Sequence, residues 1–180
     1  MIIGRSRFNT YLLLALAAVS LCGCHTTKTE EQKKSKLLAT LRVHLEATSE
    51  DPMGTVTVPI YRASPVDIAV EKEPFLTEAH VASARVVSTL GGFELQIQLN
   101  RQGIWLLQNY SASNAGRHYA IFSQFGEKGK KSRWLAAPIF TRLISSGILQ
   151  FTPDASREEC EDIAAGLNNL AKKNESNEKW

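Results

Sequence analysis

The sequence predicts an α+β domain in which a mixed or antiparallel sheet carries helices on one face. Three observations lead to this fold class. Strand-like segments outnumber helical ones, the clearest of them alternates apolar and polar residues, and the helical segments come singly between pairs of strands. The chain is long enough for one domain that holds itself together by its core.

Short β-rich segments recur along the chain. The clearest is 93–99, where four apolar side chains alternate with three polar ones, as in a half-buried strand. Pro59 and Pro65 favour an edge position or an irregular pairing for the two segments that they accompany. In chain order, we expect strands at residues 41–46, 55–61, 66–70, 84–89, 93–99, 119–125, 133–137 and 148–152.

Helical signals occur at four places. Thr77 and Asn100 are suitable N-cap residues, and Ser156 with Glu159 forms a capping box. Gly116 suits the left-handed backbone that follows a helix. The apolar residues of the last helix recur at helical spacing: Cys160, Ile163, Ala164, Leu167 and Leu170. The predicted segments are a single turn at 77–82, a helix at 101–112, a short helix or turn at 139–145, and a helix from Ser156 onward.

The amino terminus has the pattern of a secretory signal. Arg5 and Arg7 precede the uncharged apolar run 11–21, which is shorter than the roughly 20 residues needed to span a bilayer. The ending Leu-Cys-Gly-Cys resembles the lipobox of bacterial lipoproteins, in which the chain is cut before an acylated cysteine. The resemblance implies that residues 1–23 are a signal peptide, cut between Gly23 and Cys24, and that Cys24 carries lipid, palmitate among the acyl chains. The alternatives are a secreted protein cut near Gly23 and a buried amino-terminal helix.

The segment after the lipobox is expected to be a tether. Residues 24–36 contain no large apolar side chain and therefore cannot bury enough surface to fold. Residues 172–180 form a polar tail. His25 stands where an aspartate is associated with inner-membrane retention in such lipoproteins, so the resemblance favours the periplasmic face of the outer membrane over the inner one.

Charge and cysteine content narrow the classes of function. Without Arg5 and Arg7, the 21 Lys and Arg fall to 19 against 18 Asp and Glu, so the mature part is nearly neutral and no nucleic-acid partner is expected. Cys22 leaves with the signal and Cys24 carries lipid. Cys160 then remains alone, and no intramolecular disulfide is expected.

A second resemblance covers about half of the mature chain. It rests on the order of short motifs along the sequence: Asn100-Arg101 and Gly103 opening a helix, a polar turn at 111–117, Tyr119-Ala120-Ile121, Ala137-Pro138-Ile139, Gly147, and residues 151–159 leading into a helix with Gly166-Leu167. In this order, residues 93–171 resemble the head subdomain of the first periplasmic domain of SecD and SecDF, which assist Sec-dependent protein export. Residues 37–92 form the β-rich amino-terminal part of the domain.

The resemblance implies a SecD head-like fold and a role linked to protein export, with Sec translocon components or exported proteins as partners. Two departures matter. SecD carries membrane-spanning helices after its periplasmic domain, and this sequence has no such run after Cys24. The turn at 128–133 is also longer and more basic than in the family. We therefore expect this chain to share the fold of the SecD head more than the activity of SecD.

No catalytic residue, metal site or cofactor is expected. The histidines are scattered, with no spacing that places two ligands on one helical face. We expect His44 to be solvated or to make a cross-strand contact, His118 to be exposed, and Cys160 to be an inert core thiol.

The candidate contact site is Lys128, Lys130, Lys131, Arg133 and Trp134. These residues could touch anionic lipid head groups or a protein partner. The plainer interpretation is a solvated basic hairpin with the indole in the core. The sequence thus predicts a noncatalytic, protein-binding envelope lipoprotein linked to export. The alternatives are a structural or assembly lipoprotein unrelated to export and, less favoured, a periplasmic hydrolase.

Overall fold

A computed structural model describes residues 34–48, 51, 53–126 and 129–177, and of Glu175 and Asn177 only the backbone. The described chain forms one compact unit from Ser35 onward. The predicted signal peptide, Cys24, the tether up to residue 33 and Lys128 lie outside the described residues.

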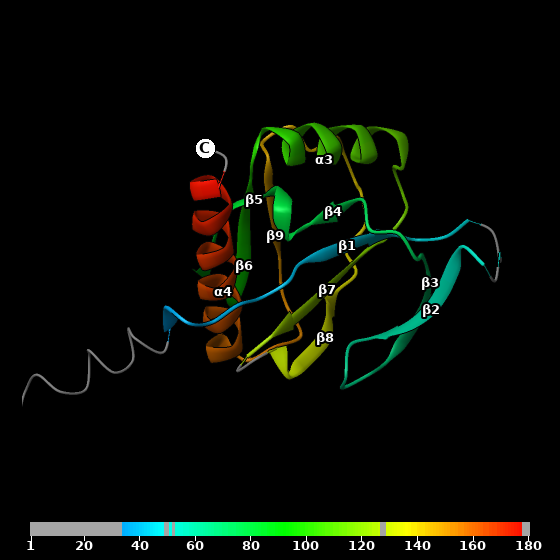
Figure 1. Cartoon of the computed structure of the whole chain (residues 1–180). Coiled ribbons are helices and arrows are strands. Elements are labelled where there is room, and N and C mark those ends of the chain that lie inside the picture. Colours follow the sequence, from blue (N-terminus) through cyan, green and yellow to red (C-terminus); the bar gives the residue numbers. More distant parts are fainter. Residues whose placement is uncertain (1–33, 49–50, 52, 127–128, 178–180) are drawn as a thin grey trace, which may run out of the picture. The chain divides into compact units, whose positions relative to one another are not determined.

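The largest sheet has four strands in the order β4-β1-β7-β8, and all of its pairs are antiparallel (Figure 1). Its strands are β1 (Arg42–Leu45), β4 (Leu76–Thr77), β7 (Tyr119–Phe125) and β8 (Lys131–Ala136). β1 lies between β4 and β7, with Val43 opposite both Leu76 and Ile121. Early and late parts of the chain therefore share this sheet.

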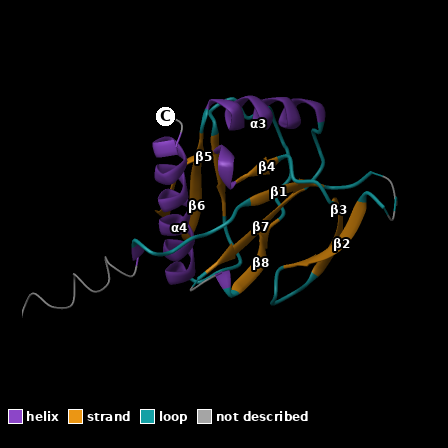
Figure 2. Cartoon of the chain, viewed as in Figure 1, coloured by secondary structure: helices purple, strands orange, loops and turns teal. Residues whose placement is uncertain are grey.

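Two smaller antiparallel sheets complete the strand content (Figure 2). The hairpin of β2 (Thr55–Ile60) and β3 (Val66–Glu71) forms a sheet of its own. The third sheet has the order β5-β6-β9, with strands β5 (Val81–Thr89), β6 (Gly92–Leu99) and β9 (Ile148–Phe151).

The helices begin at the predicted caps. Thr77 caps the 3-10 turn η1 (Glu78–His80), and the Asn100 side chain accepts a 2.9 Å hydrogen bond from the Gly103 amide at the start of α3 (Arg101–Ser113). Before α4 (Arg157–Asn177), the Ser156 amide donates to Glu159 Oε2 at 3.1 Å, and the Glu159 amide donates to Ser156 Oγ at 3.2 Å. This reciprocal pair is the predicted capping box.

A continuous core fills the space between the four-stranded sheet, the three-stranded sheet and the helices. α4 packs along β5 with its apolar stripe, in which Cys160 and Ile163 have no exposed surface. Two ring stacks extend the core, Phe75 on Tyr110 and Tyr119 on Phe140, each with centroids 4.2 Å apart. A second, smaller cluster joins the β2–β3 hairpin to Ala120, Ala137 and Trp134.

The predicted α+β class is confirmed, and most strands lie within about two residues of their predicted positions. The exceptions are β5, which begins three residues earlier than predicted, at Val81, and the short β4, which the sequence did not predict. The strands divide into three sheets, although the sequence suggested one. Residues 139–145 form no helix, because two of their backbone amides bond to residues that are distant in the sequence. The Phe140 amide donates to Arg117 O, and the Ile144 amide donates to Ser111 Oγ. α4 continues to Asn177, into the predicted polar tail.

Gly166 sets how closely α4 approaches the segment that leads into β1. A Cβ at this position would lie 2.6 Å from Ala39 N and 2.7 Å from Leu38 C. Helix propensity favours Ala over Gly by about 1 kcal/mol, but moving backbone apart costs more, so we expect Gly166→Ala to destabilise the fold by about 1–3 kcal/mol. Urea unfolding followed by tryptophan fluorescence measures this change.

Gly91→Ala is the matched control, since a Cβ there meets nothing within 4 Å. Its free energy of unfolding should stay within about 0.5 kcal/mol of the wild type. A Gly166→Ala protein as stable as the control would show that the close approach of α4 is not maintained in solution.

Candidate functional site

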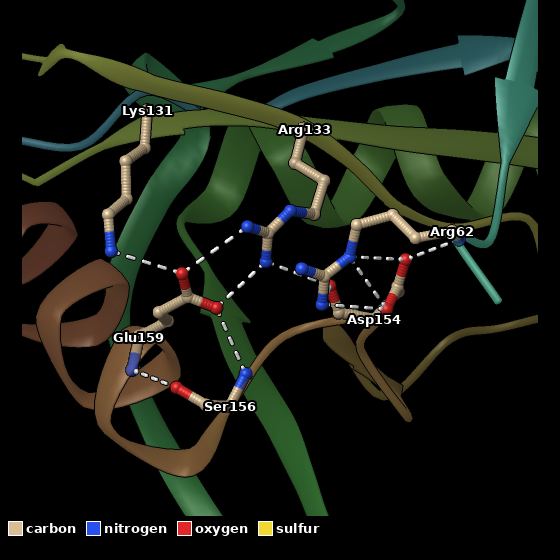
Figure 3. A network of polar contacts seen from close by, with 6 residues as sticks. All are labelled: Arg62, Lys131, Arg133, Asp154, Ser156 and Glu159. Carbon is tan, nitrogen blue, oxygen red and sulfur yellow. Dashed lines mark hydrogen bonds and ion pairs between the residues drawn. The ribbon is translucent and has the colours of Figure 1, made fainter.

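The predicted contact residues of β8 divide between its two faces. Lys131 and Arg133 reach toward the first turn of α4 (Figure 3). Trp134 instead lies against Phe122 and His44. The alternation follows from the strand itself, because successive side chains point to opposite faces. β8 therefore contributes to a charged network on one face and to a cluster of rings with His44 and Phe122 on the other.

Glu159 is the centre of the charged network. Its Oε2 lies 2.8 Å from Arg133 Nη1, and its Oε1 lies 3.1 Å from Lys131 Nζ. The hydrogen bond from Arg133 is the main cause that lowers the pKa of Glu159 to about 2, with contributions from the Ser156 amide and Lys131. The side chains of Arg133 and Glu159 are only 17% and 16% exposed, so water screens this pair less than a surface ion pair.

Asp154 connects the network to the β2–β3 hairpin. The Arg62 backbone amide donates to Asp154 Oδ2 at 2.8 Å, and the Arg62 guanidinium lies 3.1 Å from Oδ1. These hydrogen bonds lower the pKa of Asp154. Arg133 Nη1 donates to the Asp154 carbonyl at 3.1 Å, so the two acidic residues share Arg133 as a partner (Figure 3).

A pocket of about 260 Å³ lies where the hairpin meets β8. Its wall is largely apolar and consists of Pro59, Tyr61, Arg62, Pro65, Arg133, Trp134 and Asp154. Tyr61 has φ +65°, the one positive φ at a described residue other than glycine, and its side chain is exposed. A bulky residue in this conformation is strained, and strain of this kind clusters at functional sites.

The five predicted contact residues do not form one free basic cluster within the part of the chain that the structure describes. Lys131 and Arg133 pair with Glu159, Lys130 is exposed, and Trp134 is half-buried over the smaller core cluster. Lys128 lies outside the described residues. What the structure brings together is an arginine and an indole at the wall of the pocket.

His44 makes the cross-strand contact that was one of its two expected environments, whereas His118 is not exposed as expected. His44 is buried, with its Nδ1 2.8 Å from Glu71 O and its ring edge on Trp134, because the β2–β3 hairpin covers this face of β1. His118 is half-buried, with Nδ1 3.1 Å from Glu46 Oε2. Neither His118 nor Glu46 lines the pocket described above.

The remaining groups offer little for catalysis. Cys160 is buried, as expected, and burial raises the pKa of its thiol to about 11. Among the described residues, no group of three or more His, Cys, Asp or Glu side chains could hold a metal ion.

The sequence did not identify Arg62, Tyr61 or Asp154 as members of one site. Arg62 and Asp154 are 92 positions apart, and no local pattern links them. The capping box identified Glu159 as a helix-start residue, but its pairing with Lys131 and Arg133 depends on how β8 lies across the end of α4.

No protein-family model matches the sequence, and no curated protein matches it. Among solved structures, the chain is similar to that of a membrane component SecDF that enhances protein export, with 19% identity, a TM-score of 0.55, and coverage of 83% of this chain and 71% of that one. It is also similar to SecDF in the super-membrane-facing form, with 19% identity and a TM-score of 0.53.

The second match covers 82% of this chain but only 21% of that structure's chain. The SecD/SecDF head-like fold predicted from the sequence is confirmed by these matches. No described helix combines the length and apolar character needed to cross a membrane.

Glu159→Gln tests whether the network stabilises the fold through charge. Glutamine preserves the capping box, so the change removes mainly the ionic part. We expect a loss of about 1–2 kcal/mol at pH 7, measured by urea unfolding. Because the folded pKa of Glu159 is lowered to about 2, its stabilisation is present above the unfolded pKa and is lost as pH falls from about 5 toward 2.

The difference between wild type and Glu159→Gln should therefore shrink over that acidic range. Glu158→Gln, at an exposed neighbour in the same helical turn, is the control and should change stability much less. A difference that stays constant from pH 7 to pH 2 would contradict the assignment of this stabilisation to the ionised carboxylate.

Proposed function

We propose that this protein is a lipid-anchored, noncatalytic protein-binding module that handles exported proteins at a bacterial envelope membrane. The observation that carries the proposal is the SecDF-like fold over 83% of the chain, together with a lipobox-like sequence that would anchor it through Cys24. The matched SecDF is described as a membrane component that enhances protein export.

The chemistry of the described site supports binding over catalysis. A general acid or base works best when its pKa lies near the working pH, whereas arginine partners lower the pKa of Asp154 and bring that of Glu159 to about 2. A nucleophilic cysteine needs a lowered pKa, and that of Cys160 is raised. These groups are suited to holding structure together.

The surface supplies apolar side chains for a protein partner. Tyr61 borders the small pocket, and Ile139 and Leu143 are 45% and 50% exposed beside a larger cavity. Aromatic and aliphatic side chains of this kind are favoured in the centre of protein interfaces. The proposed partners are Sec translocon components or exported proteins.

The anchor is tested by comparing the native protein with a Cys24→Ala variant. We expect the native form to lose residues 1–23, gain acyl mass and sediment with membranes, and the variant to do none of these. Intact-mass spectrometry and membrane fractionation give the readouts, and separation of inner from outer membranes tests the predicted outer-membrane location. Equal mass gain and equal fractionation of the two forms would contradict the lipid anchor.

The partner is tested by photocrosslinking in cells. A photoreactive amino acid replaces Tyr61 or Leu143, and the exposed Lys172 on α4 serves as the control position. We expect Sec components or exported chains to be crosslinked from the first two positions and not from the control. Crosslinks to other envelope proteins alone would favour the structural or assembly lipoprotein.

A further inference from the structure

The two edges of the three-stranded sheet β5-β6-β9 differ. At the β5 edge, the Ala84 amide donates to Asn168 Oδ1 at 2.7 Å, and Asn168 Nδ2 donates to the Ala84 carbonyl at 2.9 Å. The side chain of Asn168, on α4, thus replaces a neighbouring strand. Covering an edge in this way prevents unwanted pairing with other chains.

Among the described residues, no side chain from another element covers the β9 edge in this way. The Leu99 amide donates to Gly147 O at 2.9 Å, and Leu149 and Phe151 occupy equivalent positions opposite Ile97 and Leu95. Because hydrogen-bonded and non-hydrogen-bonded pairs alternate along an antiparallel ladder, the intervening residues Ile148 and Gln150 direct their backbone groups away from β6.

The outward backbone groups of β9 are largely unpaired. The Ile148 amide lies 3.3 Å from Ser146 Oγ. The Ile148 carbonyl and both backbone groups of Gln150 have no hydrogen-bond partner among the described residues. A sheet edge that presents unpaired N–H and C=O groups is a site where another strand can be added.

This open edge faces a cavity of about 720 Å³. Ile148, Leu149 and Gln150 all line it, although their side chains alternate between the faces of the sheet. The cavity therefore follows the backbone edge of β9 and not one face alone. Its volume falls in the range of about 300–1,000 Å³ that is typical of binding pockets.

The segment 141–146 also lines the cavity, and distant groups hold its backbone in place. The Phe140 amide donates to Arg117 O at 3.0 Å, and the Ile144 amide donates to Ser111 Oγ at 2.9 Å. This wall offers the exposed Leu143 together with Arg142, while Glu94 contributes an acidic group. A mixed wall of this kind accepts apolar and polar side chains.

We propose that the cavity binds an extended polypeptide segment, which adds to the sheet as a new strand beside β9. The occupant is a polypeptide because the open edge presents a backbone donor and acceptors at strand spacing, and a peptide backbone complements them along its length. Because backbone hydrogen bonds do not involve the side chains of the ligand, such a site can bind segments of many sequences. This inference rests on the proposed protein-binding function, and it specifies where on the domain the partner binds and in which conformation.

The test compares Gln150→Pro with Gln150→Ala. Both variants remove the same side chain, which bonds to Glu94 and Gln96, but only proline also removes the outward amide N–H. Proline is tolerated on an edge strand when its nitrogen faces away from the ladder. Thermal unfolding of both variants confirms that the proline variant is folded.

The probe is a fluorescein-labelled ten-residue peptide of alternating Val and Thr with terminal lysines, and its copy N-methylated at alternate residues is the ligand control. Fluorescence anisotropy measures the dissociation constants. We expect Gln150→Pro to bind the probe about tenfold more weakly than Gln150→Ala, and the wild type to bind the methylated copy about tenfold more weakly than the unmethylated probe.

Equal affinities of the two Gln150 variants, equal binding of the methylated peptide, or no binding of the probe to the wild type would each overturn the proposal. Sedimentation that shows dimerisation through β9, lost in Gln150→Pro, would assign the edge to a second copy of this chain and overturn it too. If the crosslinks to export partners persist in Gln150→Pro cells, the protein-binding function stands and only the β9 site fails.

Discussion

The short segment from Asp154 to Glu159 joins three elements of the domain through two carboxylates. Asp154 binds Arg62 and so fixes the tip of the β2–β3 hairpin, while Glu159 binds Arg133 and Lys131 and caps α4. The ionised forms carry these contacts, because hydrogen bonds from arginine lower both pKa values. Three elements that are far apart in the sequence, the hairpin, β8 and α4, thus meet at one charged network whose energy depends on its partial exclusion from water.

That network also accounts for the character of the small pocket. Arg62, Arg133 and Asp154 line it, yet their charged groups are bonded to partners, and what the pocket offers is mainly rings and prolines. The strained backbone of Tyr61 places a ring at this position. The larger cavity is different, because its wall includes backbone groups of β9 that no described residue pairs with.

Local sequence patterns predicted most elements and few of their contacts. Alternation identified 93–99, and capping residues located both long helices, because these signals depend on neighbours a few positions away. The expected exposure of His118 was wrong, because its Nδ1 lies 3.1 Å from Glu46 Oε2. The helical alternative for 139–145 was also wrong, because the backbone there bonds to Arg117 and Ser111. The basic turn was recognised, but its pairing with Glu159 was not.

The sequence by itself determined the α+β class, the caps, the buried stripe of α4 and the resemblance to the SecD head, because each depends on residue order and local periodicity. Only the tertiary structure decided that the strands divide into three sheets, that Arg62 meets Asp154, and that Asn168 closes one sheet edge while β9 stays open. The physical reason is that strand pairing and ion pairing join residues tens of positions apart. The packing of the whole core decides which of these residues meet.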